Sequence, residues 1–103
     1  MLELRPNCEH CNKDLAPHAS DAMICSFECT FCRDCVTTVL QEVCPNCGGN
    51  FSVRPQRPLE DWKNQNNLSH YPASQQRKYR PVDLTAHAAL LARQAAHALT
   101  KKT

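Results

Sequence analysis

Eight cysteines, all within the first 47 residues, are the side chains of this chain whose type and spacing could do chemistry. They are Cys8, Cys11, Cys25, Cys29, Cys32, Cys35, Cys44 and Cys47. Thiolates at Cys-x-x-Cys spacing are natural zinc ligands, because zinc prefers a tetrahedron of soft donors. Eight thiolates fill two such tetrahedra. The spacing therefore predicts a module built around two Zn²⁺ ions.

A disulfide framework is the alternative use of so many cysteines. The N-terminal residues 1–6 have no cationic start followed by an apolar run, so no signal peptide is expected. No stretch reaches the roughly 18 apolar residues of a membrane span. We therefore expect a cytoplasmic protein with reduced thiols, no membrane association, and metal sites in preference to disulfides.

The elements that must position these thiols fit into residues 1–54, a length that buries too small a core to fold well without metal or disulfides. Residues 22–25 and 29–32 are short and apolar and predict a hairpin. Asp34 predicts the cap of a short helix that carries Val36, Val39 and Leu40. Gly48 and Gly49 predict a tight turn after Cys47. Residues 50–54 alternate and predict a final strand.

Pro55 and Pro58 indicate a boundary after this module. Residues 55–82 read as a linker with a candidate short helix at 58–70, where Pro58 suits a first turn. Residues 83–100 predict an amphipathic helix capped by Asp83. Its apolar stripe consists of Leu84, Ala88, Leu91, Ala95 and Leu99. This stripe could pack on the module, pair with another copy or bind a partner groove.

The net charge of +2 hides an asymmetry. Residues 1–54 hold four Lys/Arg and seven Asp/Glu, whereas residues 55–103 hold eight and three. Metal-bound thiolates would make the module still more acidic, so it is a poor surface for phosphates. The basic tail could still touch nucleic acid weakly.

Aromatic residues in the tail are a second feature that could indicate nucleic-acid binding. Trp62, Tyr71 and Tyr79 alternate with Lys63, Arg77, Lys78 and Arg80 and could stack on single strands. We favour the alternative in which the tail wraps back on the module, with aromatics covering the core and cations facing the acidic surface. Phe27, Phe31 and Phe51 could form a binding surface, but most of them are expected to fill the core with Met23, Ile24, Val36, Leu40 and Val53.

The run from Cys29 to Val36, followed by Cys44-Pro-Asn-Cys47, resembles the RING finger family over residues 8–47. That resemblance implies an all-cysteine variant, with Cys29 where the family usually has His. It also implies a cross-brace of treble-clef type. The first zinc would then take Cys8, Cys11, Cys32 and Cys35, and the second would take Cys25, Cys29, Cys44 and Cys47. The expected fold is a small zinc-stabilised α+β module with a hairpin and a short helix, followed by a mainly helical tail.

Three further stretches are similar to a family of short bacterial proteins, domain of unknown function twelve seventy-two. They are residues 2–8 (LELRPNC), 21–32 (DAMICSFECTFC) and 44–49 (CPNCGG). The resemblance implies a bacterial, cytosolic, zinc-binding protein with no assigned reaction.

The RING resemblance suggests ubiquitin ligase activity, but the residues at two positions argue against it. Ligases commonly have Ile or Leu before the second ligand and Arg after the eighth, where this chain has His10 and Gly48. The spacing of Cys25, Cys29 and Cys32 matches a radical-enzyme iron–sulfur motif, but the chain lacks room for the barrel of those enzymes. A thioredoxin-like redox role lacks its βαβ pattern.

The histidines are expected to lie at the surface. His10 and His18 are interpreted as loop residues because eight thiolates already fill both sites, and His70 as a surface residue. His87 and His97 lie ten residues apart, whereas a ligand pair on a helix needs three- or four-residue spacing.

By elimination, the sequence predicts a non-catalytic protein with two structural zinc ions that most plausibly binds another protein. Candidate partner contacts are Leu84, Leu91, Leu99, Arg77, Lys78 and Arg80. The alternative is a nucleic-acid-binding zinc protein that uses its basic tail, and a RING-type ligase is less favoured.

Overall fold

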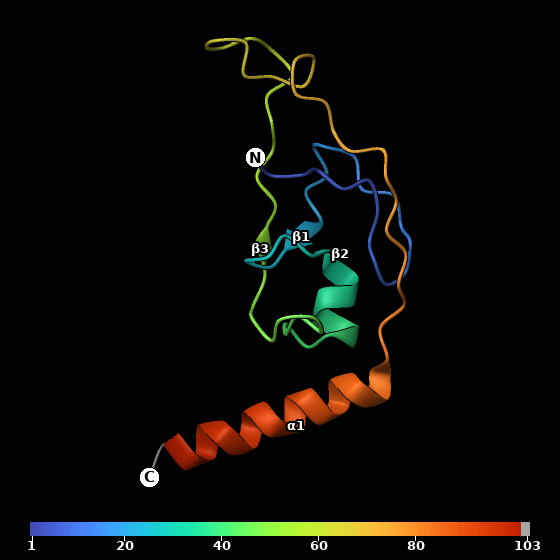
Figure 1. Cartoon of the computed structure of the whole chain (residues 1–103), viewed down its shortest axis with the longest axis vertical. Helices are drawn as coiled ribbons and strands as arrows, with labels where there is room; N and C mark the ends of the chain where they lie inside the picture. The colour runs from blue at the N-terminus through green and yellow to red at the C-terminus, as the bar shows by residue number, and fades with distance from the viewer. Residues whose placement is uncertain (102–103) are drawn as a thin grey trace.

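The computed structural model describes residues 1–101, with side chains described through Leu99. Its elements are β1 (Ala22–Ile24), β2 (Thr30–Cys32), the π-helix η1 (Cys35–Val39), β3 (Ser52–Val53) and α1 (Leu84–Lys101). The strands form one antiparallel sheet in the order β2-β1-β3 (Figure 1). A small α+β module with a C-terminal helix is therefore confirmed.

The β1–β2 hairpin lies where the apolar residues predicted it. Met23 pairs with Phe31, and Ile24 pairs with Thr30. The connection closes through a backbone bond from Glu28 to Cys25, and Glu28 adopts a φ of 66°. All three β2 residues are buried, because β2 packs against η1 as well as β1. The strand predicted at 50–54 is confirmed in shorter form as β3.

The short helix after Cys35 is present, but Asp34 does not cap it. Asp34 already has helical torsions, and its side chain makes no capping bond. The Leu40 amide donates to the Cys35 carbonyl at 2.8 Å, which is the i→i+5 spacing of a π-helix. Val36 and Leu40 are buried by this turn as predicted.

The apolar core is small and rich in cysteine. It contains Leu15, Ala22, Phe31, Val36 and Leu40 together with thiols, with Phe51 packed edge-on against Phe31 at 5.6 Å. Two predicted core residues lie elsewhere: Phe27 is 72% exposed at the hairpin turn, and Val53 is 48% exposed on β3. An edge strand of two residues leaves one side of Val53 uncovered.

Two buried charges tie the N-terminal segment to the sheet. The Arg54 guanidinium is buried and donates to the carbonyls of Arg5 (2.8 Å) and Ala16 (2.9 Å). The buried Glu9 carboxylate accepts from the Thr30 amide (2.7 Å) and from Arg5 (2.8 Å). Because buried polar groups are costly when unpaired, these bonds fix how the segment crosses the sheet.

The helix proposed at 58–70 is wrong. This stretch forms a protruding loop of turns and bends, shown in yellow to gold at the top of Figure 1. Asn64 and Gln65 have φ values of 52° and 61°, in the left-handed region that ends helices. The side chains of Leu59 and Trp62 are 71% and 76% exposed on this loop.

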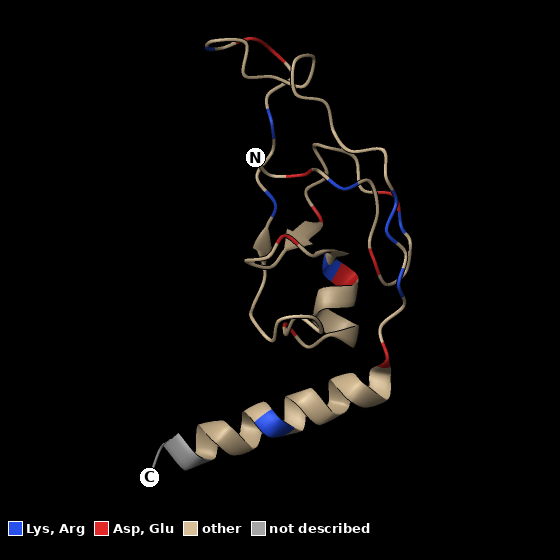
Figure 2. Cartoon of the chain, viewed as in Figure 1, with Lys and Arg blue, Asp and Glu red and all other residues tan. Residues whose placement is uncertain are grey.

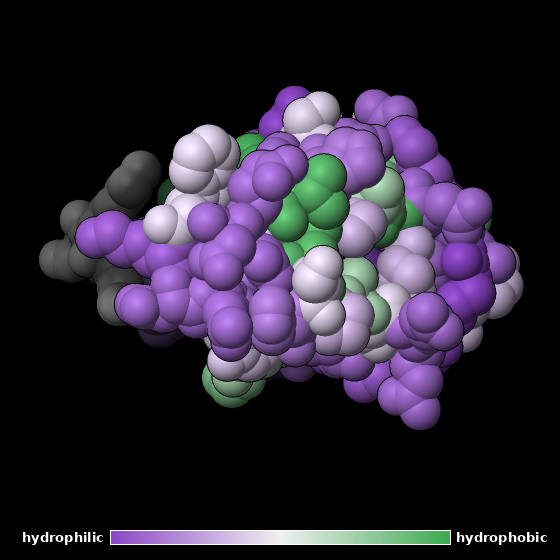
Figure 3. All heavy atoms as spheres, turned by 90° about the horizontal axis from the view of Figure 1, so that it is seen from above, coloured by the Kyte–Doolittle hydropathy of each residue, from purple (hydrophilic) through white to green (hydrophobic). Residues whose placement is uncertain are grey.

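The segment after the loop wraps back along the N-terminal residues, as predicted for the tail. The Ser74 amide donates to Leu4, and the Arg80 amide donates to Glu9. The aromatic residues do not cover the core, however, because Tyr71 and Tyr79 are 40% and 55% exposed. Hydrogen bonds of the backbone and of the Asn7 side-chain amide hold the tail, together with Val82, which packs against the core. Seen from the loop end, the surface is mostly hydrophilic, with apolar residues showing between the hydrophilic ones, most clearly near the middle (Figure 3).

Asp83 caps α1 as predicted, since its Oδ1 accepts from the amides of Thr85 (3.0 Å) and Ala86 (3.1 Å).

The expectation that His87 lies at the surface is wrong. His87 is 3% exposed, and its Nε2 lies 2.7 Å from the Leu40 carbonyl at the end of η1. About two turns further along α1, the Gln94 side-chain amide donates to the Gly48 carbonyl at 2.8 Å. The module therefore receives a polar face of α1, not its apolar stripe.

Replacing Arg54 with Met should lower the free energy of unfolding of the metal-loaded protein by about 2–4 kcal/mol, because the carbonyls of Arg5 and Ala16 both lose a buried charged donor. Denaturant unfolding measures this loss. Arg33→Met, at an exposed arginine that bonds the Ser20 carbonyl, is the matched control and should cost less than about 0.5 kcal/mol. Equal effects of the two substitutions would contradict the structural role of Arg54.

Candidate metal centres

The first cysteine group joins the N-terminal turn to the sheet and η1. The Sγ atoms of Cys8, Cys11, Cys32 and Cys35 all lie within 4.8 Å of one another. The Cys11 and Cys32 sulfurs are 3.7 Å apart. A zinc tetrahedron with bonds of about 2.3 Å has sulfur–sulfur edges of about 3.8 Å. The spacing of these thiols therefore fits a zinc ion.

The turn that carries Cys8 and Cys11 is shaped by local backbone bonds. The Asn12 amide donates to the Cys8 carbonyl, and the Cys8 amide donates to Lys13, both at 2.9 Å. Asn12 adopts a φ of 65°, which asparagine tolerates better than most residues. The reversal presents both sulfurs on one side, opposite Cys32 at the end of β2 and Cys35 at the start of η1.

The second group gathers Cys25, Cys44 and Cys47 within the same distance. The Cys44–Cys47 turn closes through bonds from Gly48 to Cys44 (2.8 Å) and from Cys44 to Gly49 (2.7 Å). Gly48 has a φ of 78°, where a side chain would be strained, and an added Cβ would also lie 3.1 Å from the Gln94 amide nitrogen. Of the two glycines singled out in the sequence, Gly48 is the one that the turn requires.

Amide groups point at the sulfurs of this second group. The Gly49 amide lies 3.4 Å from the Cys47 sulfur, and the Phe27 amide lies 3.4 Å from the Cys25 sulfur. N–H donors of this kind offset the negative charge that thiolates gather around a metal. They are the outer layer that a thiolate metal site needs.

Cys29 falls outside the mutually close group of three thiols. Its thiol interacts with that of Cys25, and the Asn46 side-chain amide donates to its sulfur at 3.5 Å. The structure thus brings together seven of the eight candidate ligands and leaves the eighth beside its group. The role of all eight as ligands stays a prediction.

The two groups interleave along the chain. Cys8 and Cys11 meet cysteines from beyond Cys25, and Cys25 meets Cys44 and Cys47. This grouping is the cross-brace that the RING resemblance implies, and it differs from a sequential arrangement in which the first four cysteines share one metal.

Without metal, burial opposes ionisation of several of these thiols. Burial raises the pKa of Cys35 and Cys44 well above the usual range of a thiol. Burial also acts on Cys25, but hydrogen bonds from the Phe27 and Cys29 amides outweigh it and lower the pKa of that thiol. Metal binding must therefore displace protons from the buried thiols, and the ion in turn stabilises the thiolates.

None of the histidines belongs to either metal-ligand group among the described residues. The His10 Nδ1 accepts from the Val82 amide at 2.9 Å, so His10 holds the tail. His18, His70 and His97 are exposed, as expected. His87 was the contact that sequence reasoning missed, because nothing in its spacing distinguishes a buried helix histidine from an exposed one.

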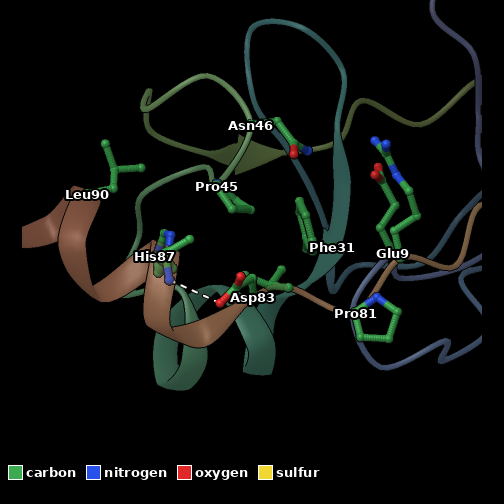
Figure 4. A pocket seen from close by; sticks show the side chains of 11 residues that line it. Glu9, Phe31, Pro45, Asn46, Pro81, Asp83, His87 and Leu90 are labelled. Atoms are coloured by element: carbon green, nitrogen blue, oxygen red, sulfur yellow. Dashed lines mark hydrogen bonds between the residues drawn. The ribbon is translucent and has the colours of Figure 1, made fainter.

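A small cavity of about 270 Å³ lies where α1 meets the module, between Phe31, Pro45 and the first turns of the helix (Figure 4). Its volume is below the roughly 300–1,000 Å³ of ordinary small-molecule sites. Asp83 and His87 contribute its helix side, and the buried His87 Nδ1 has no hydrogen-bond partner. We therefore interpret the cavity as a gap left where α1 docks on the module.

The candidate partner contacts lie on two segments. Leu84 and Leu99 are 57% and 69% exposed on α1, and Leu91 is half-buried. In the tail, Arg77 pairs with Asp14 at 2.7 Å and donates to Asn12. The remaining tail candidates, Lys78 and Arg80, are exposed.

Comparison with known proteins supplies a family and no activity. The model of the family described as protein of unknown function (DUF1272) matches residues 1–57. An uncharacterized protein of Rhizobium meliloti (strain 1021) is 53% identical over 81 residues, covering 79% of this chain and 89% of that protein. No solved structure matches the chain. Within residues 1–101, no helix combines the length and apolarity needed to cross a bilayer.

Cys29→Ser should weaken metal binding at the second site at least about tenfold and leave the first site unchanged, because Cys29 is the nearest thiol able to complete that site. Competition with a chromophoric chelator measures both affinities. Ser26→Ala, at an exposed neighbour in the same turn, is the control. Two unchanged affinities in the Cys29 variant would show that three thiolates hold the second metal.

Proposed function

The chain belongs to the DUF1272 family, and we propose that it is a zinc-built, non-catalytic module that binds another protein. The observation that carries the proposal is the meeting of cysteines from four separate segments in two groups. Such an arrangement uses metal to hold segments together. Residues elsewhere on the surface would then contact the protein partner.

Structural zinc is favoured over catalytic zinc because cysteine is the only ligand type in either group. Catalytic zinc sites keep one position open for water or substrate, whereas structural sites are closed by four protein ligands. The first group is complete with four thiols, and Cys29 stands next to the second. We therefore propose that neither metal contacts substrate and that the protein is not an enzyme.

A RING-like, treble-clef fold is the finer form of this proposal. The interleaved grouping, the two glycine- and asparagine-assisted cysteine turns and the short helix after Cys35 support it. Ligase activity is not part of the proposal. The Nδ1 of His10 is used by the Val82 amide, and Gly48 is held against α1 by Gln94. The two positions that RING ligases use for contact are thus occupied within this chain.

A protein partner is favoured over nucleic acid by the distribution of charge. Acidic and basic residues are both scattered over the cysteine module, and the returning tail carries three basic residues close together, Arg77, Lys78 and Arg80 (Figure 2). One of these cations, Arg77, is already paired with Asp14. The alternative, nucleic-acid binding by Lys78 and Arg80, predicts an affinity that falls steeply with added salt. Reduced thiols also favour a cytoplasmic location.

The purified protein should contain two zinc atoms per chain by elemental analysis. Removing them with a chelator should unfold the cysteine module, because metal binding of about 10–16 kcal/mol per site drives the folding of such modules. The amide NMR spectrum of residues 8–47 reports this loss, and added zinc should restore it. A metal-free sample with an unchanged spectrum would refute the structural role of zinc.

A further inference from the structure

Four of the five residues of the apolar stripe of α1 are exposed and only Leu91 is half-buried, although α1 itself is docked. The docked face consists of His87, Leu90 and Gln94. At 3.6 residues per turn, the stripe of Leu84, Ala88, Leu91, Ala95 and Leu99 lies about 90° around the helix axis from that face. Ala88 and Ala95 are exposed like the terminal leucines. The side of the helix most suited to packing therefore faces outward.

Charge is nearly absent from this helix. Arg93 is the only Asp, Glu, Lys or Arg between Leu84 and Leu99, seen as the single blue band on α1 in Figure 2. Helical spacing places Arg93 on the side away from the stripe. Nothing on the stripe would repel an identical surface, whereas a partner of strong charge would find no complement there.

The order of leucine and alanine along the stripe is the same from either end of the helix. If two copies of α1 run antiparallel about a two-fold axis beside Leu91, Leu84 of each lies opposite Leu99 of the other, and Ala88 lies opposite Ala95. Leucines then meet at the ends and, as the two copies of Leu91, beside the axis, and the small alanines between them let the two helices pack closely. Antiparallel helices also align their dipoles favourably.

We propose that this stripe docks the same stripe of a second copy of the chain, in an antiparallel helix pair. The inference rests on the proposed function, the binding of another protein, and names a second copy of the chain as that protein. An 18-residue helix is about 27 Å long, so one stripe buries less than the roughly 800 Å² per partner of a standard interface. The dimer is accordingly weak, with a Kd on the order of 10–100 µM.

Sedimentation equilibrium of the intact, zinc-loaded chain at ~5–500 µM, a range set around the expected Kd, tests this directly. The wild-type mass should rise from 11.6 kDa toward twice that value. Leu84→Glu and Leu99→Lys should each raise the Kd at least about tenfold, because each buries an unpaired charge. Neither should unfold α1, since both residues are exposed and each new charge suits its end of the helix dipole. Ala89→Glu and His97→Lys, exposed and off the stripe, are the matched controls and should leave the Kd unchanged.

The double variant Leu84→Glu/Leu99→Lys decides the orientation. In the antiparallel pair the opposite charges meet, so its Kd should return to within about threefold of wild type. In a parallel pair like charges would meet, and a double variant weaker than both single variants would overturn the proposal. A wild-type chain that stays monomeric at the highest concentration would also overturn it. Zinc content and circular dichroism of the same samples test the metal module separately, so a monomer with two zinc atoms leaves the proposed function standing.

Discussion

The meeting of the Cys8–Cys11 turn with Cys32 and Cys35 is the contact on which the rest of the structure depends. It closes the N-terminal segment over the hairpin and sets where η1 begins. The second group does the same for the Cys44–Cys47 turn, which α1 then uses as a docking point through Gln94. Interleaving links the two groups along the chain, because each spans a segment that the other holds.

Thiols placed this close need further interactions to hold their segments together. The apolar core around Phe31 and Leu40 is too small to supply that alone. Buried polar bonds supplement it: Glu9 satisfies the Thr30 amide, and Arg54 satisfies two carbonyls far apart in sequence. Metal would convert a cluster of buried thiols that resist ionisation into the strongest crosslink of the module. The polar framework then orients the segments that the metals join.

The sequence predicted local structure correctly where a residue type has one well-defined structural role. The hairpin followed from two apolar runs, the start of α1 from Asp83, and the turn after Cys47 from Gly48. The cysteine grouping came from a family resemblance, since spacing alone allows a sequential alternative. Among the expectations that failed, two failed through local backbone conformation and one through a tertiary contact. Asp34 was absorbed into the helical turn, residues 58–70 formed turns through left-handed Asn64 and Gln65, and His87 was buried by a carbonyl 47 residues away. The apolar stripe of α1 was identified in the sequence, but which face packs on the module was not, because a hydrogen-bonding face outcompeted it.

Cadmium-113 substitution with proton–cadmium correlation NMR tests the interleaved brace most directly, because it records which cysteine Hβ protons couple to which metal. We expect one cadmium to couple to Cys8, Cys11, Cys32 and Cys35, and the other to Cys25, Cys44 and Cys47 with Cys29. A cadmium that coupled to both Cys8 and Cys25 would contradict the account, because the segments would then be joined in sequence order and the contact that organises this fold would not exist.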